Sequence, residues 1–228
     1  MTFVLTPPVQ ASVAVDSTTN RFPVRRIFCV GRNYEAHARE MGNDPDREPP
    51  FFFTKPADAV VDCPCALPYP VQTQDLHHEI ELVVALGTGG ANIAPQDVPA
   101  HIWGAAVGID FTRRDLQQLA KDTRRPWDMS KGFDQSAPMS AIRPMADIAS
   151  LTQGRIWLNV NDEPRQDADI ADMIWSVNDH VAYLSRYVTL APGDLIMTGT
   201  PAGVGAVQKG DVLTGGVDGV GTLDVQIT

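Results

Sequence analysis

The sequence predicts a β-rich α+β fold, closed or sandwiched, rather than a doubly wound parallel sheet. Short apolar runs bounded by turn residues recur along the whole chain, whereas few segments have helical spacing. The C-terminal stretch KGDVLTGGVDGVGTLDVQIT shows the pattern clearly, because short strands alternate there with tight glycine turns. No internal repeat is present. We expect residues 1–22 to be an N-terminal lead-in and residues 23–228 to form a single domain.

The first half of the chain is predicted to combine strands with two helices. Residues 1–22 contain a short strand, FVLT, and a loop. The strands that follow are VRRIFCVGRNY (24–34), PFFFTKP (50–56), HHEIELVVALG (77–87) and IWGAAVGIDFT (102–112). The segment YEAHAREMG is predicted to be helical, with Gly42 placed to end the helix, and NDPDREPP to be a polar surface segment. A polar helix is predicted in TRRDLQQLAKDTRRP.

The second half begins with two short strands around an Asn-Asp turn, GRIWLNVNDEPRQDA. Apolar residues then recur at helical spacing, which predicts one amphipathic helix over residues 170–188. APGDLIMTGTPAGVG is predicted to be a turn, a strand and a glycine-rich loop, and the tail closes the fold with short strands.

The charge balance excludes some partners and permits others. The net charge is −10, which argues against nucleic acid or an anionic membrane as a partner, because both favour a basic surface. A local cluster of cations or a metal can still bind an anionic small molecule. The N-terminus lacks the pattern of a signal peptide, and no apolar run approaches the ~18–20 residues of a membrane span. Three cysteines at these spacings fit neither a disulfide framework nor a zinc site, so we expect a reduced, cytoplasmic protein.

The strand HHEIELVVALG raises a question of charge. Its alternation places Glu79 and Glu81 on one face, which turns apolar after them, so we expect both faces to be covered. A buried ion costs several kcal/mol unless a cation compensates it. With Asp110 at the end of a later strand, these residues offer three hard oxygen ligands, which suit Mg²⁺ or Mn²⁺. The alternative is that the glutamates face solvent or pair with the cations Arg113, Arg114 or Lys131.

Other candidate site residues are weaker on pattern alone. His37 and Glu40 lie at i, i+3 on one helix face, where a carboxylate can fix the imidazole tautomer for water activation; a solvated salt bridge is the alternative. The glycine-rich TGTPAGVG is no phosphate loop, but its amides and the Thr200 hydroxyl could bind a carboxylate. Lys131 could be a plain surface lysine. No Gly-x-Ser-x-Gly elbow supports a serine nucleophile.

Seven motifs together resemble the fumarylacetoacetate hydrolase family, and within it the short acylpyruvate and fumarylpyruvate hydrolases. They occur in the family's order from about residue 24 to the C-terminus, and they are FCVGRNYEAHAREM, FFFTKP, HHEIELVVALG, GIDFTRRDLQ, WDMSKGFDQSAP, NVNDEPRQ and GDLIMTGTPAGVG. The resemblance implies a mixed β-sandwich roll, a homodimer, and one catalytic domain over residues 23–228.

The resemblance also implies roles for particular residues. Glu79, Glu81 and Asp110 match the family's ligands for one divalent cation, Mg²⁺ or Mn²⁺. His37 and Glu40 match its water-activating pair, and Lys131 matches the lysine that contacts the developing enolate. Three positions match substrate contacts: Arg32, Gln117 and Thr200. The segment MGNDPDREPP falls where the family carries a lid that closes over ligand.

The activity that follows is hydrolysis of the C–C bond of a 3-acylpyruvate, a small 2-oxo acid, with fumarylpyruvate from the gentisate route of aromatic catabolism as the preferred substrate. Water would attack the distal carbonyl, and a pyruvate enolate would leave. Two alternatives stay open. The same metal site could decarboxylate or tautomerise oxaloacetate, or isomerise a 2-hydroxy-dienedioate, without water attack. The chain could also bind such a ligand without turnover.

Overall fold

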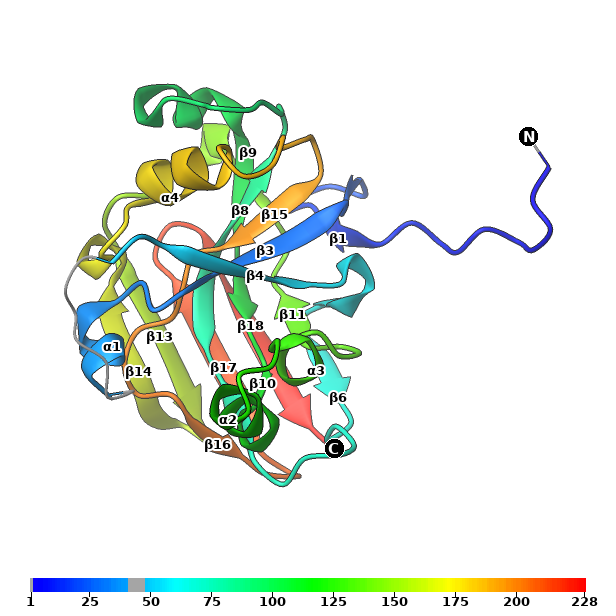
Figure 1. The fold of residues 1–228 in the computed structure, drawn as a ribbon, viewed down its shortest axis with the longest axis vertical. Coiled ribbons are helices and arrows are strands. Elements are labelled where there is room, and N and C mark those ends of the chain that lie inside the picture. Colours follow the sequence, from blue (N-terminus) through cyan, green and yellow to red (C-terminus); the bar gives the residue numbers. More distant parts are fainter. Residues whose placement is uncertain (1, 41–47) are drawn as a thin grey trace.

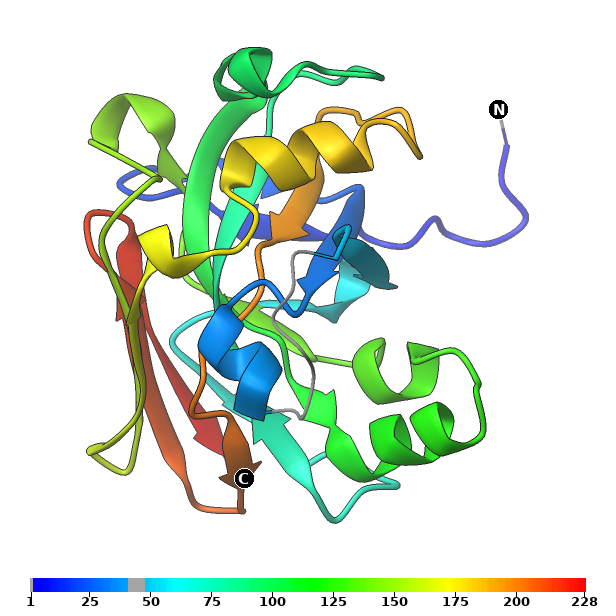
Figure 2. The same ribbon diagram turned by 60° about the vertical axis from the view of Figure 1, so that its left-hand side comes forward.

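Two β-sheets supply the framework of the described residues, which are 2–40 and 48–228 of the computed structural model (Figure 1). The larger, eight-stranded sheet has the order β4 (Phe51–Lys55), β3 (Arg26–Gly31), β15 (Asp194–Met197), β8 (Ile80–Leu86), β9 (Ile102–Ile109), β11 (Ala137–Met139) and β5 (Val60–Asp62), with β12 (Arg143–Pro144) also on β9. The five-stranded sheet has the order β14 (Glu163–Asp169), β13 (Arg155–Val160), β17 (Val212–Val217), β18 (Gly221–Ile227) and β6 (Cys65–Leu67). Figure 2 shows the two sheets as separate layers.

Smaller elements fill the edges. A three-stranded sheet joins β10 (Thr112–Arg113), β7 (Leu76–His78) and β16 (Gly205–Val207). The α-helices are α1 (Glu35–Glu40), α2 (Arg114–Asp122), α3 (Asp128–Lys131) and α4 (Val177–Leu184). The short 3₁₀ helices are η1 (Ala57–Ala59), η2 (Pro95–His101), η3 (Met145–Asp147) and η4 (Ile170–Asp172). This mixed, sheet-rich architecture with few helices confirms the predicted fold class. None of the described helices has the length and apolar character needed to cross a bilayer.

Strand β8 is buried on both faces, as its sequence predicted. Leu82 and Val84 face the core between the two sheets, where they belong to a cluster with Ile156 and Leu158 of β13. Val83 and Ala85 face a second core on the other side of the sheet. Every residue of β8 therefore has to be apolar or to have a polar partner inside the protein.

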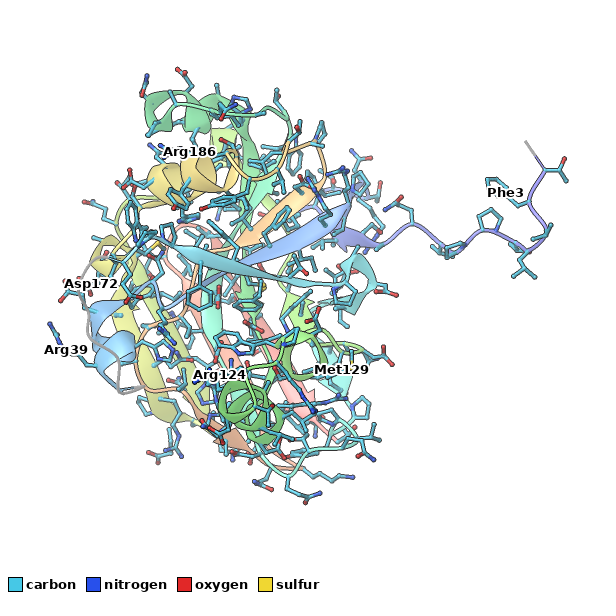
Figure 3. The ribbon with its side chains drawn as sticks, viewed as in Figure 1. Phe3, Arg39, Arg124, Met129, Asp172 and Arg186 are labelled. Carbon is cyan, nitrogen blue, oxygen red and sulfur yellow. The ribbon has the colours of Figure 1, made fainter. Side chains whose placement is uncertain are left out.

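The lead-in differs from its prediction in two respects, the absence of the FVLT strand and the presence of a hairpin in place of the predicted loop. Residues 3–6 form no strand, because FVLT lies in an extended arm that pairs with none of the described strands; Figure 3 labels Phe3 on this arm. The hairpin of β1 (Ser12–Ala14) and β2 (Arg21–Pro23) packs on the larger sheet, and Val13 and Phe22 belong to its second core. The division at residue 22 between a lead-in and a catalytic domain stays a prediction.

The single amphipathic helix predicted over residues 170–188 is wrong. The chain forms η4, then an extended connection, and then α4, which begins after the N-cap Ser176. Asn33 holds the connection: its side-chain oxygen accepts from Trp175 N at 2.8 Å, and its Nδ2 donates to Trp175 O at 2.9 Å and to Thr198 O at 2.8 Å. Helical periodicity identifies the buried positions, but it does not show the contact of Asn33 with the Trp175 backbone. This contact holds an extended connection where a turn of helix was predicted.

Asn33→Ala is expected to lower the free energy of unfolding by about 2–4 kcal/mol, because it leaves one buried donor and two acceptors without the side chain that satisfies them. Denaturant unfolding would measure the loss. Asn20→Ala is the matched control, since the Asn20 side chain is exposed. An equal loss in both variants would contradict the role given to Asn33.

Candidate active site

The pairing of β8 with β9 brings the three predicted metal ligands together. Glu81 lies opposite Gly108 in the antiparallel register, and Asp110 N donates to Glu79 O at 2.9 Å just beyond the paired residues. One oxygen of each carboxylate lies within 4.8 Å of the others, and all three residues are buried. Residues about 30 positions apart in sequence thus form one acidic triad: Glu79, Glu81 and Asp110.

Two of the expected cations compensate this acidic triad. Lys131 Nζ donates to Glu79 Oε2 at 2.7 Å and to Asp110 Oδ2 at 2.6 Å, so Lys131 is a buried site residue and not a surface lysine. Arg114 Nη2 donates to Glu79 Oε1 at 2.5 Å. Arg113, the third cation considered, instead places its guanidinium 4.3 Å from the centre of the Phe133 ring. The predicted pairing alternative therefore holds in part for Glu79, although the triad can also serve as a metal site.

Sequence reasoning missed Lys55, the last residue of β4. Its side chain is fully buried, and Nζ lies 2.8 Å from Asp110 Oδ1. The same ammonium donates to the backbone oxygens of Phe111 and Lys131. Lys55 therefore links a candidate metal ligand to the backbone that carries Lys131. The sequence offered one signal for this residue, a lysine at the end of the aromatic strand FFFTK. A lysine at that position is ordinarily expected to face solvent.

The surroundings raise the pKa of Glu81 and of Lys131, which disfavours the charged form of the glutamate and favours that of the lysine. Burial raises the pKa of Glu81, and the neighbouring carboxylates of Asp110 and Glu79 raise it further, although Gly199 N donates to its Oε2 at 2.6 Å. Burial would lower the pKa of Lys131, but Asp110 and Glu79 outweigh it, so that pKa is raised. Lys131 is therefore held as an ammonium, which is a donor and not a general base.

The acidic triad fits a divalent cation on two observations. Its donor set is three buried carboxylate groups, which is the chemistry that Mg²⁺ and Mn²⁺ prefer. In addition, Asp110 Oδ1 receives no hydrogen bond from the described residues, although Lys55 Nζ lies close to it outside hydrogen-bond geometry. A cation would use that oxygen and relieve the mutual repulsion that raises the pKa of Glu81.

Glu79 and Glu81 of the acidic triad open into one pocket. The predicted site residues His37, Arg32, Gln117, Thr200 and Lys131 line it with Glu79 and Glu81. The structure thus brings most of the predicted site together, and adds an aromatic wall and a further cation that the sequence did not predict: Phe51, Phe53, Trp127 and Lys121. The Glu40 side chain and residues 41–47, where the helix stop at Gly42 and most of the predicted lid fall, lie outside the described part of the chain.

Thr200 is engaged by the protein itself. Its Oγ1 donates to Ile80 O at 2.8 Å and accepts from Gln166 Nε2 at 2.7 Å. Gln166 in turn contacts His78 Nδ1 at 3.0 Å, which makes His78 a structural residue. Thr200 would have to exchange the Ile80 acceptor before it could donate to a substrate carboxylate. The sequence did not predict this role of Gln166, because its partners His78 and Thr200 are distant in sequence.

Comparison with known proteins identifies the family. The model of the C-terminal domain of fumarylacetoacetate hydrolase matches residues 26–228. The chain belongs to this family. A crystal structure of a fumarylpyruvate hydrolase from Pseudomonas aeruginosa, in complex with Mn²⁺ and pyruvate, is 49% identical, covers 100% of this chain and 99% of its own, and superposes with a TM-score of 0.97.

Two further relatives bear on function. A fumarylpyruvate hydrolase from a Ralstonia species is 40% identical over 189 residues, 82% of this chain and 98% of its own length. An oxaloacetate tautomerase from Escherichia coli (strain K12) is 40% identical over 199 residues, 87% of this chain and 90% of its own length. Similar identities therefore connect this chain to two different reactions within one family.

Proposed function

We propose that this protein is a metal-dependent hydrolase of 3-acylpyruvates, with fumarylpyruvate as substrate and fumarate and pyruvate as products. The observation that carries this proposal is the convergence of a buried acidic triad, a charged lysine and a histidine on one pocket. Similarity over the full length to a fumarylpyruvate hydrolase that binds Mn²⁺ and pyruvate supports it.

In the proposed site, Glu79, Glu81 and Asp110 would hold one Mg²⁺ or Mn²⁺, as the sequence resemblance implied. A divalent cation there would supply Lewis-acid polarisation of the 2-oxo acid head. His37 lines the same pocket and would take a proton from water. Glu40 would orient His37, and Arg32, Gln117 and Thr200 would contact the substrate.

The proposed reaction balances as a hydrolysis. The water oxygen bonds to the distal carbonyl carbon, and the bond between that carbon and the adjacent methylene carbon breaks. Its electron pair passes into the pyruvate fragment as an enolate, and a proton from water then returns to the methylene carbon. Lys131 would donate to the enolate oxygen as negative charge develops, which requires the ammonium form that its raised pKa favours.

Loss of diketone absorbance would test this function. Purified protein with Mn²⁺ or Mg²⁺ would be assayed against fumarylpyruvate, acetylpyruvate and oxaloacetate, with and without EDTA. Metal-dependent release of one pyruvate per acylpyruvate is expected. Turnover of oxaloacetate alone would overturn the proposal.

Oxaloacetate tautomerisation is the second candidate, because the Escherichia coli relative with that name covers 87% of this chain at 40% identity. That reaction needs proton transfer at carbon but no attacking water. A change in the enol absorbance of oxaloacetate without carbon–carbon cleavage would distinguish it. For the assembly and location, we propose a cytoplasmic homodimer.

His37→Ala is expected to retain Mn²⁺ binding while hydrolysis falls by about 10²–10⁴-fold, since general base catalysis contributes that range. Titration of bound Mn²⁺ would be measured beside turnover. His101→Ala is the control, because His101 Nδ1 contacts the Thr88 carbonyl oxygen at 3.1 Å and the residue does not line the pocket. Near-normal turnover in His37→Ala would contradict the water-activation role.

A further inference from the structure

The metal end of the pocket is electrically balanced without substrate. The three carboxylates of the acidic triad face three cations, Lys55, Lys131 and Arg114, each of which forms an ion pair with Glu79 or Asp110. A divalent cation adds two positive charges. The head of a 2-oxo acid brings one negative charge as substrate and two as its enolate, so the enolate head alone balances the charge at this end.

Two more cations line the same pocket and are not part of that balance. Neither Arg32 nor Lys121 forms an ion pair with any described residue. Both are partly shielded from water. Burial lowers the pKa of Lys121, and the charges of Arg114 and Arg32 lower it further, which indicates that these cations are close enough to repel one another. Two pocket cations that form no ion pair with the described residues favour an anionic ligand.

An aromatic wall holds both cations. The Arg32 guanidinium lies 5.4 Å from the centre of the Phe51 ring, and Lys121 Nζ lies 5.5 Å from the Trp127 ring. Phe51 and Trp127 pack edge to face with their centres 5.5 Å apart. The positive φ of 57° at Arg32 fixes the turn that presents its side chain. Arg32 and Lys121 are therefore supported from one continuous surface.

Helix α2 sets the spacing from the metal end. Arg114, Gln117 and Lys121 follow at i, i+3 and i+7, so all three occupy one face, and all three line the pocket. Arg114 binds Glu79 at the start of this row, and Lys121 lies about 10 Å farther along the helix axis. The lysine side chain can reach back several ångströms toward the metal end.

We propose that Lys121 and Arg32 form a second anion subsite, which binds the distal carboxylate of a dianionic acylpyruvate. The inference rests on the proposed hydrolase function and names the residues that would recognise the second carboxylate of its substrate. In fumarylpyruvate six bonds separate the two carboxylate carbons, roughly 7 Å in an extended chain. Acetylpyruvate has no second carboxylate. The carboxylates of oxaloacetate are only three bonds apart, roughly 3.5 Å, about half the span of fumarylpyruvate.

The experiment compares two substrates in three variants. Lys121→Met removes the charge and keeps the apolar length, Lys121→Arg keeps the charge, and Arg124→Gln removes one positive charge just beyond the same helix. Arg124 is exposed and does not line the pocket, and Figure 3 shows it beside α2. KM and kcat would be measured for fumarylpyruvate and acetylpyruvate, with Mn²⁺ binding as the check that each variant is folded.

In Lys121→Met, the ratio of kcat/KM for fumarylpyruvate to that for acetylpyruvate is expected to fall about 10- to 100-fold, mainly through KM. Lys121→Arg and Arg124→Gln should keep the ratio within about threefold. A ratio unchanged in a Lys121→Met protein that binds Mn²⁺ would overturn the subsite, as would an equal fall in Arg124→Gln. Failure of the unaltered protein to hydrolyse either substrate would overturn the proposed function itself, and the subsite with it.

Discussion

Glu81→Gln is expected to abolish divalent-cation binding and hydrolysis together, while leaving the metal-free protein at least as stable as the original. The substitution replaces one of three anionic oxygen ligands by a neutral amide. Affinity for Mn²⁺ should fall by at least ~100-fold, since even residues that only support a ligand contribute 10–100-fold. Activity should fall in parallel at a fixed metal concentration.

The stability part of this expectation follows from the raised pKa of Glu81. Burial and the carboxylates of Asp110 and Glu79 disfavour its charged form in the folded, metal-free protein. A folded-state pKa above the unfolded value contributes stability at low pH, and that contribution is lost as pH rises through the folded pKa. At neutral pH the metal-free protein therefore carries a penalty that glutamine removes, while the amide oxygen can still accept from Gly199 N.

Thermal unfolding with and without Mn²⁺ would measure both parts. The original protein should gain stability on adding Mn²⁺, and Glu81→Gln should gain none at the same concentration. Glu163→Gln is the matched control, because Glu163 is exposed on β14 and should leave metal binding unchanged. If Glu81→Gln bound Mn²⁺ with unaltered affinity, Glu81 could not be a ligand.

The acidic triad was predictable because its geometry is largely local. Glu79 and Glu81 are two residues apart at the start of a strand, and Asp110 directly follows the strand that pairs with it. Their burial could be inferred from the apolar residues that follow on both faces of β8. The pairing of the cations could not be predicted in this way, because Lys131 and Arg114 reach Glu79 from separate helices. The motif resemblance, and not periodicity, singled out Lys131.

Errors in the sequence prediction arise where a distant side chain decides the local structure. Residues 170–188 have the apolar period of one helix, yet Asn33 captures Trp175 and replaces a turn by an extended connection. The FVLT segment has strand-forming residues but no partner among the strands that the structure describes. Trp127 joins the pocket by packing on Phe51 of β4, and Lys121 joins it with its ammonium over the Trp127 ring. Such contacts have no signature in neighbouring sequence.

Lys55→Met is expected to lower the free energy of unfolding of the metal-free protein by about 3–5 kcal/mol, the cost of removing one partner from a buried ion pair. Lys55 Nζ is the cation nearest Asp110 Oδ1, and it also satisfies the carbonyl oxygens of Phe111 and Lys131. Methionine has a similar length but removes the Lys55 donor from both oxygens and leaves the Ser136 hydroxyl as donor to the Lys131 oxygen. Lys209→Met is the matched control, because Lys209 is exposed and should change stability by less than about 0.5 kcal/mol.

Unfolding in the presence of Mn²⁺ would distinguish charge compensation of the acidic triad by Lys55 from a purely structural role of this residue. Without the lysine, the acidic triad has lost one of its three compensating charges, so binding of a divalent cation should stabilise the folded protein more. The Mn²⁺-induced rise in Tm should therefore be larger in Lys55→Met than in the original protein, while kcat falls because the backbone that carries Lys131 loses an anchor. An equal Mn²⁺-induced rise in both proteins would mean that Lys55 supports the fold without tuning the acidic triad, since charge compensation at Asp110 is the one effect that a cation can replace.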